Sequence, residues 1–257
     1  IKRGESVKKK EISASDFEDA VDYFLALVLA EGVIKSKEEI ERIGIRIVAP
    51  GEYFYSHNPI DKVFIKKLEV AKELAPLHIK PIVSELNKLK KTFPATPMIA
   101  VSDSAFHADL PDKARIYAIP KANADKFGIR RFGYHGTSVR SVLLSVKKLL
   151  GKLPEKIIVC HLGSGSSITA VKNGASFDTS MVLTPLEGLP MGTRVGDIDP
   201  GALILLGKKL KLNYEELEEY LNKNCGLLGV SQKSSDVREL LKAEEAGDKD
   251  AKTALEL

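Results

Sequence analysis

The chain has 257 residues, of which 44% are hydrophobic and 29% charged, with a formal net charge of +4. Its length allows one large core or two smaller ones, and because basic and acidic residues are mixed along it, we expect no nucleic-acid partner. The two cysteines, Cys160 and Cys225, form no Cys-x-x-Cys pattern, and the apolar stretch from Phe24 to Ala30 is too short to cross a membrane. These features argue against a disulfide framework, a thiolate zinc site and a membrane anchor, and favour a reducing cytoplasm.

Helices and short strands alternate in the first half. Apolar residues at three- and four-residue spacing from Phe17 to Val28 predict a helix capped by Ser13 or Ser15. Ser36 followed by Glu39 predicts a capping box for a short second helix. Next we expect a strand at Ile43 to Val48, helices at Ile60 to Leu74 and Ile79 to Leu89, and a buried strand at Pro97 to Val101.

The second half continues the alternation. We expect a helix at Thr137 to Leu150, strands at Lys156 to Cys160 and Ser166 to Val171, and helices at Gly201 to Leu210, Tyr214 to Lys223, Asp236 to Ala246 and Asp248 to Leu257. Asn173-Gly174 is a strong turn signal. The pattern is typical of an α/β protein, with domains predicted over residues 1–104 and 105–257.

A glycine-containing segment lies between two of these strands. It runs from His161 to Ser167 and includes Leu162, Gly163, Ser164 and Gly165. Two glycines separated by one residue let the backbone turn tightly and direct N–H groups at an anion, which predicts a phosphate-binding hairpin. The segment is no P-loop, since no Gly-Lys-Ser/Thr follows. An ordinary glycine hairpin is the alternative.

The segment from Pro185 to Pro200 concentrates glycine, proline and charge. Within it Arg194 stands among small residues, and a guanidinium fits phosphate or carboxylate oxygens with two parallel hydrogen bonds. The alternative is a structural turn in which Arg194 pairs with Asp197 or Asp199.

Four further polar residues are candidates. His135 directly precedes a predicted helix, whose N-terminus favours negative charge, and Asp103 follows a predicted strand where α/β sheets present site residues. A lone histidine at a helix start is more often a capping or packing residue, and for Asp103 the alternative is a cap of the following turn. Arg46 on its strand and His78 are weak candidates individually.

Taken in order, these segments resemble the acetate kinase family, within the actin-like and sugar-kinase-like ATPase superfamily. The resemblance rests on Leu74-Ala75-Pro76-Leu77-His78, Asp103-Ser104-Ala105-Phe106-His107, His135-Gly136-Thr137-Ser138, Cys160-His161-Leu162-Gly163, Asp178-Thr179-Ser180-Met181, Leu183-Thr184-Pro185-Leu186-Glu187-Gly188-Leu189 and Met191-Gly192-Thr193-Arg194.

The resemblance implies two ribonuclease-H-like domains, the first on the acceptor side and the second on the nucleotide-phosphate side. It also implies reversible transfer of the ATP γ-phosphoryl group to acetate with Mg²⁺, by direct in-line attack, in a homodimer. Arg46 and Arg194 would bind the carboxylate and the phosphoryl oxygens. His135 would donate a hydrogen bond in the transition state, and Asp103 would position the acceptor or the magnesium.

The same resemblance implies the binding surfaces. Val48, Leu77, Tyr134 and Pro185 would form the pocket for the acyl chain, with His78 nearby. The segment from His161 to Gly165 would hold phosphates, and Asp236, Val237 and Arg238 match a segment near the nucleoside. We assign no metal-ligating residue in this chain.

The sequence also departs from the family pattern. Ala49 and Pro50 replace His and Gly, and Ser164, Val139, Val195 and Ile79 stand where Asn, His, Ser and Asn are common. The first phosphate hairpin and the Gly-Gly-Ile-Gly-Glu adenosine segment do not occur, and the chain begins with Ile1 instead of Met. We therefore expect truncation at both ends, two incomplete domains and no turnover by this polypeptide alone. A propionate or butyrate kinase and a non-catalytic nucleotide-binding or regulatory fragment are the alternatives.

Overall fold

The computed structural model describes residues 2–3, 6–7 and 17–257. Two short strands, β1 (Lys2–Arg3) and β2 (Ser6–Val7), pair antiparallel, and helix α1 spans Phe17–Ala30. The expected caps of this helix, Ser13 and Ser15, lie outside the described residues.

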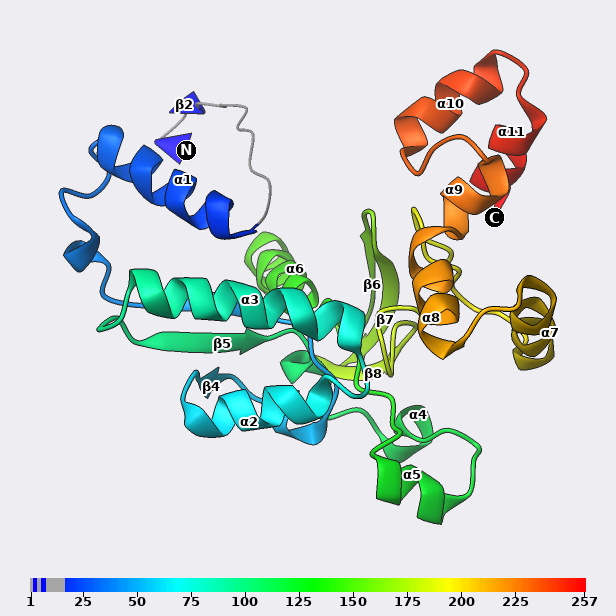
Figure 1. Cartoon of the computed structure of the whole chain (residues 1–257), viewed down its shortest axis with the longest axis horizontal. Helices are drawn as coiled ribbons and strands as arrows, with labels where there is room; N and C mark the ends of the chain where they lie inside the picture. The colour runs from blue at the N-terminus through cyan, green and yellow to red at the C-terminus, as the bar shows by residue number, and fades with distance from the viewer. Residues whose placement is uncertain (1, 4–5, 8–16) are drawn as a thin grey trace.

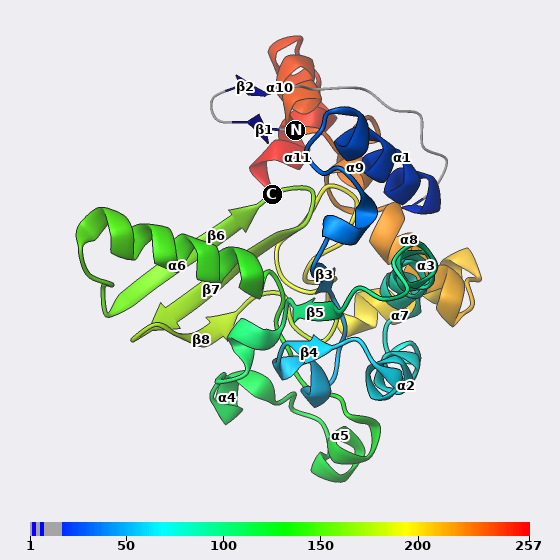
Figure 2. The same ribbon diagram turned by 90° about the vertical axis from the view of Figure 1, so that its left-hand side faces the viewer.

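The first of the two larger sheets has the strand order β3-β5-β4. Strand β3 (Ile43–Ile47) runs parallel to β5 (Met98–Ser102), and β4 (Asn58–Pro59) pairs antiparallel with the other edge of β5. Helices α2 (Lys62–Ala71) and α3 (Pro76–Thr92) share a core with this sheet. Both helices lie on the same side of it in Figure 2. That core contains Ile45, Ile47, Phe64, Leu86 and Ala100. Because side chains alternate along a strand, Arg46 and Val48 point to the opposite face.

The second sheet is an antiparallel meander of β6 (Lys156–Leu162), β7 (Ser166–Lys172) and β8 (Ala175–Thr179). Helix α6 (Gly136–Leu150) lies across one face of it, where Val139 and Leu143 pack against Val159 and Val171 (Figure 2). Asn173 and Gly174 both have positive φ, 52° and 81°, and form the two-residue turn that joins β7 to β8.

The remaining segments are helical. Along the chain, β5 is followed by the one-turn helix η3 (Ala105–His107) and by helices α4 (Asp112–Arg115) and α5 (Lys121–Phe127), which precede α6. After a long loop follow α7 (Pro200–Leu210), α8 (Tyr214–Lys223), α9 (Gly226–Ser231), α10 (Val237–Glu245) and α11 (Lys249–Glu256). The last three form a small cluster around Leu240, Ala251 and Ala254, at the upper right of Figure 1.

The predicted capping box at Ser36 is wrong. The segment forms a single 3₁₀ turn, η1 (Lys37–Glu39), and the Ser36 side chain makes no cap hydrogen bond to it. Asp61 instead caps the next helix by accepting from the Phe64 N–H at 2.8 Å, so α2 begins later than expected.

The prediction of an α/β chain is confirmed, while the division at residues 104 and 105 stays a prediction. Within the described part of the chain, every helix is too short or too polar to traverse a lipid bilayer.

Candidate active site

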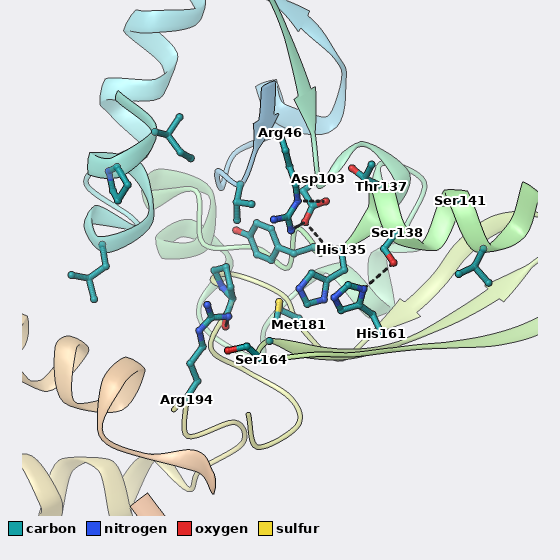
Figure 3. Close-up of a pocket in the computed structure, with 18 residues that line it drawn as sticks. Arg46, Asp103, His135, Thr137, Ser138, Ser141, His161, Ser164, Met181 and Arg194 are labelled. Atoms are coloured by element: carbon teal, nitrogen blue, oxygen red, sulfur yellow. Dashed lines mark hydrogen bonds and ion pairs between the residues drawn. The ribbon is translucent and has the colours of Figure 1, made fainter. Parts of the chain in front are cut away.

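A cavity of about 850 Å³ lies where the two larger sheets approach each other. Arg46 reaches it from β3, Asp103 from the end of β5, His135 from the start of α6, and Arg194 from the loop before α7 (Figure 3). Residues that are far apart in sequence thus surround one space.

Asp103 joins the two halves of this site. Its carboxylate accepts from Arg46, with Nη2–Oδ2 at 2.7 Å and Nε–Oδ1 at 3.2 Å, and from the backbone N–H of His135 at 2.7 Å. Its side chain is 1% exposed, whereas that of Arg46 is 55% exposed. Burial by itself raises the pKa of Asp103, but the Arg46 charge and these hydrogen bonds more than offset it, so the pKa is lowered. The carboxylate is therefore ionised and already partnered.

His135 has an unusual backbone. It precedes α6 with φ of 59°, in the left-handed region, and the Asp103 carboxylate and carbonyl accept from the N–H groups of His135 and Gly136. Its ring stacks on that of His161, with centroids 4.0 Å apart and planes at 25°. Burial, followed by the neighbouring His161, lowers the pKa of His135 to about 4. The imidazole is therefore neutral at pH 7.

Arg194 has no carboxylate partner among the described residues. Its Nη1 donates to the carbonyl of Pro185 at 3.1 Å and lies 3.7 Å from the sulfur of Met191. Asp197 accepts from the Gly188 N–H and Asp199 from the Ala202 N–H, so neither forms the pair that the structural-turn alternative required. Burial and then the charge of Arg46 lower the pKa of Arg194.

The four apolar residues predicted for the acyl pocket line the same cavity. They are Val48, Leu77, Tyr134 and Pro185. Tyr134 is buried and donates from its hydroxyl to the Leu183 carbonyl at 2.7 Å, so it presents a fixed wall. The sequence prediction missed Met181, which is fully buried and lines the cavity as well. The side chain of His78, in α3, is outside the described part of the structure.

The predicted phosphate hairpin connects β6 to β7 at the edge of this cavity. The N–H of Gly163 donates to the Gly165 carbonyl at 3.1 Å, whereas no described hydrogen bond uses the N–H of Ser164 or Gly165. A Cβ placed on Gly165 would lie 3.2 Å from Nη1 of Arg194 and 3.6 Å from Nε2 of His135. The hairpin tip therefore faces the two side chains expected to handle the phosphoryl group.

A neighbouring cavity of about 440 Å³ is lined by part of the predicted phosphate segment and by two of the three residues predicted near the nucleoside. Leu162, Gly163, Ser164, Asp236 and Val237 line it, and Ser164 also lines the larger cavity. Arg238 does not line this cavity, because its 86% exposed side chain pairs with Asp236 at 2.5 Å on the surface.

Two serines that the sequence prediction missed hold the histidines. Ser138 Oγ lies 2.8 Å from Nδ1 of His161, and Ser167 Oγ lies 2.9 Å from Nδ1 of His135. Ser138 stands inside a segment already singled out. Ser167 faces the same side of the sheet as His161, its register partner, so strand alternation was the available signal.

The described residues do not fit a protein-held magnesium site. No group of three or more His, Cys, Asp or Glu side chains that could hold a metal ion occurs in the described ranges. Asp103 is the one carboxylate lining the larger cavity, and its oxygens are committed to Arg46 and His135.

Comparison with known proteins gives a consistent result. The family model described as the Acetokinase family matches residues 1–257. The acetate kinase of Clostridium novyi is 46% identical over 97% of this chain, and that of Desulfitobacterium hafniense is 45% identical over 90%. The chain spans 63% and 59% of the length of these relatives.

Solved structures show the same similarity. The crystal structure of Porphyromonas gingivalis acetate kinase superposes with a TM-score of 0.81 at 39% identity, over 92% of this chain and 60% of that one. A propionate kinase from Francisella tularensis gives a TM-score of 0.86 at 38% identity, over 93% of this chain and 61% of that one. These neighbours confirm the actin-like ATPase fold class. The family model matches the full length of this chain, and together with these similar structures this match shows that the chain belongs to the acetokinase family.

Proposed function

We propose that the complete gene product transfers the γ-phosphoryl group of ATP reversibly to acetate, forming acetyl phosphate and ADP. The observation that carries the proposal is the convergence of Arg46, His135 and Arg194 on one cavity that also has an apolar wall and a phosphate hairpin. A small carboxylate and a phosphoryl group are the two ligands that such a cavity suits.

The reaction requires charge neutralisation and alignment more than covalent chemistry. An oxygen of the carboxylate attacks the γ-phosphorus, and the bond from phosphorus to the bridging oxygen of ADP breaks as the new bond forms. No proton must move, because both the attacking and the leaving oxygen are anionic. A neutral His135 suits this reaction, since it donates a hydrogen bond without acting as an acid.

Each of the two arginines binds a different anionic group of the substrates. Arg46 is anchored by Asp103 through Nε and Nη2, which holds the guanidinium at the end of β3 next to Val48. Arg194 lies on the side of the phosphate hairpin, near Gly165. We infer that Arg46 orients the carboxylate and that Arg194 stabilises the transferring phosphoryl oxygens. Asp103 then acts as a positioning residue.

We propose that Mg²⁺ enters with the phosphates of ATP, because the described residues supply no free carboxylate for it in the cavity. A homodimer, a cytoplasmic location and a domain boundary near residue 104 belong to the same proposal. The family resemblance motivates the first, the cysteine pattern the second, and the separation of the two larger sheets the third.

Propionate is the second candidate substrate. A propionate kinase is among the similar structures, and the pocket wall of Val48, Leu77 and Pro185 is apolar. One methylene changes transition-state binding in such a pocket by only about 1–3 kcal/mol.

The test is formation of acyl phosphate by the complete gene product with ATP and Mg²⁺ and with acetate, propionate or butyrate. We expect acetate and propionate to be used, and butyrate to be used less well. Far better use of butyrate would refute acetate as the substrate. Tight ATP binding by calorimetry without any turnover would instead identify a non-catalytic nucleotide-binding or regulatory protein.

A further inference from the structure

Ser167 does not line the substrate cavity, yet it bonds the histidine that does. It lies in β7, is completely buried, and places Oγ 2.9 Å from Nδ1 of His135. The other ring nitrogen, Nε2, faces the hairpin tip beside Nη1 of Arg194. Nδ1 of His135 therefore bonds a buried side chain of β7, whereas Nε2 faces the cavity.

The buried hydroxyl needs an acceptor for its proton. Among the hydrogen bonds of the described residues, Nδ1 of His135 is the one partner of Ser167 Oγ. Were Nδ1 to carry the ring proton and donate it, the Ser167 hydroxyl proton would be left buried without a partner, an arrangement that proteins avoid. Donation from Ser167 to Nδ1 satisfies both groups and leaves the ring proton on Nε2.

The charges around the ring favour the same arrangement. Burial opposes a second proton most, and His161, Arg46 and Arg194 add to it against the charge of Asp103, so the ring is neutral and has a single N–H. A lone pair on Nε2 would repel the oxygens of an anion held beside Arg194, whereas an N–H on Nε2 attracts them.

We propose that Ser167 is a positioning residue, whose hydroxyl donates to Nδ1 of His135 and fixes the tautomer that presents Nε2–H to the transferring phosphoryl group. The tautomer follows from the hydrogen bonds of the chain alone, while its role in phosphoryl transfer rests on the proposed function. Partners of this kind commonly set which ring nitrogen of a catalytic or ligating histidine holds the proton.

The test is nitrogen NMR of the complete gene product labelled with ¹⁵N-histidine, with the His135 signals assigned by their loss in His135→Asn. At neutral pH we expect a protonated Nε2 and an unprotonated Nδ1. In Ser167→Ala the two tautomers should both be populated, and Ser167→Thr, which keeps the hydroxyl, should restore the original spectrum. If either variant fails to fold, Ser167→Cys replaces it, because its thiol is of similar size but a weaker donor and should also populate both tautomers.

Thr169→Val is the matched control. Thr169 is also fully buried and faces the same side of β7, and its one described side-chain hydrogen bond is to Thr179 at 3.1 Å and not to His135. The Thr169→Val variant therefore loses a buried hydrogen bond in the same strand but should leave the His135 signals unchanged.

Kinetics give the second measurement. We expect Ser167→Ala to lower kcat by roughly ten- to a hundredfold, with KM for acetate changed little, because the hydrogen bond acts through His135. A protonated Nδ1 in the unmodified protein, or an unchanged tautomer in Ser167→Ala, would overturn the proposal. If no carboxylate is phosphorylated, the proposed function fails while the NMR result still decides the tautomer.

Discussion

Arg194 is a half-buried cation whose described hydrogen-bond partners are both neutral. The carbonyl of Pro185 and the sulfur of Met191 hold it, and its pKa is lowered by burial and by Arg46. A charge removed from water without a counter-charge costs free energy unless a ligand supplies one. We therefore expect the residue to contribute to anion binding more than to the stability of the unliganded fold.

Replacing Arg194 with Ala should separate these two contributions. We expect kcat for acetyl phosphate formation to fall by about 10²–10³ or more, because a donor aimed at developing charge is lost. The melting temperature should stay the same or rise. Arg194→Lys retains the charge but not the planar fork, so it should recover only part of the activity.

Arg140 provides the control for this experiment. It is exposed on α6 and does not line the larger cavity, so Arg140→Ala should leave kcat unchanged. A loss of stability without a loss of kcat in Arg194→Ala would show that Arg194 is a structural residue of its loop.

Sequence patterns identified the residues that line the cavity. They were less successful with the hydrogen-bond partners that hold these residues in place. Arg46, Asp103, His135 and Arg194 were all predicted, and they meet in one cavity. The partner of each was harder to predict, because the Asp103–Arg46 pair joins residues 57 positions apart through strand pairing. Strand alternation gives the face of β7 on which Ser167 lies, but its bond to His135 also depends on how α6 packs against that face, which the strand pattern does not encode.

At the scale of elements, the predictions succeeded where local signals act together. Helix α8 has the expected bounds and a capping box formed by Asn213 and Glu216. Strand β8 was missed although the Asn173-Gly174 turn implies a partner strand after it. Strand β4 has two residues and exists because β5 offers it an edge, so its sequence carries almost no signal.

The start of α6 is the element on which the site geometry depends most. Gly136 is its first residue, and a Cβ there would lie 2.4 Å from the Asp103 carbonyl oxygen and 2.8 Å from Cβ of Phe106. Only a glycine lets the helix approach the end of β5 closely enough for Asp103 to bond His135.

Gly136→Ala should therefore destabilise the fold by about 1–3 kcal/mol through overpacking and should also lower kcat. Differential scanning calorimetry and the acetyl phosphate assay measure the two effects. Gly44→Ala is the matched control, since its new methyl group would meet Val101 at an ordinary 3.6 Å. Equal behaviour of the two variants would mean that the contact between α6 and Asp103 is looser than the structure shows.

At the scale of the whole molecule, His107 in η3 connects the segment before α6, through Tyr134, to strand β8, through Ser176. It is fully buried, with Nε2 2.9 Å from the Tyr134 carbonyl and Nδ1 2.8 Å from Ser176 Oγ. Since a carbonyl only accepts, Nε2 carries the ring proton and Ser176 donates to Nδ1. Burial lowers the pKa of His107 to about 4 from the ordinary 6.5.

This difference predicts how stability depends on pH. Between pH 6.5 and about 4 the unfolded chain binds a proton at His107 that the folded chain does not, so stability falls as the pH falls. The full contribution, present above pH 6.5, is on the order of 3 kcal/mol. His135, with a pKa lowered to about 4, adds to the same slope.

Melting temperatures measured from pH 7 to pH 4 test this prediction. His107→Gln removes one titrating group, so its melting temperature should be lower at pH 7 but should depend less on pH. A variant with an undiminished pH dependence would assign the acid sensitivity to other groups.

The absence of a carboxylate beside Arg194 within the described structure also bears on the life of the protein in a cell. Any anion that occupies the space between Arg46 and Arg194 relieves their mutual repulsion, so it binds the folded form and not the unfolded one. Occupancy then reduces the fraction of molecules that unfold and become accessible to proteases. Under the proposed function, binding of the substrate anion therefore stabilises the folded form in addition to starting the reaction.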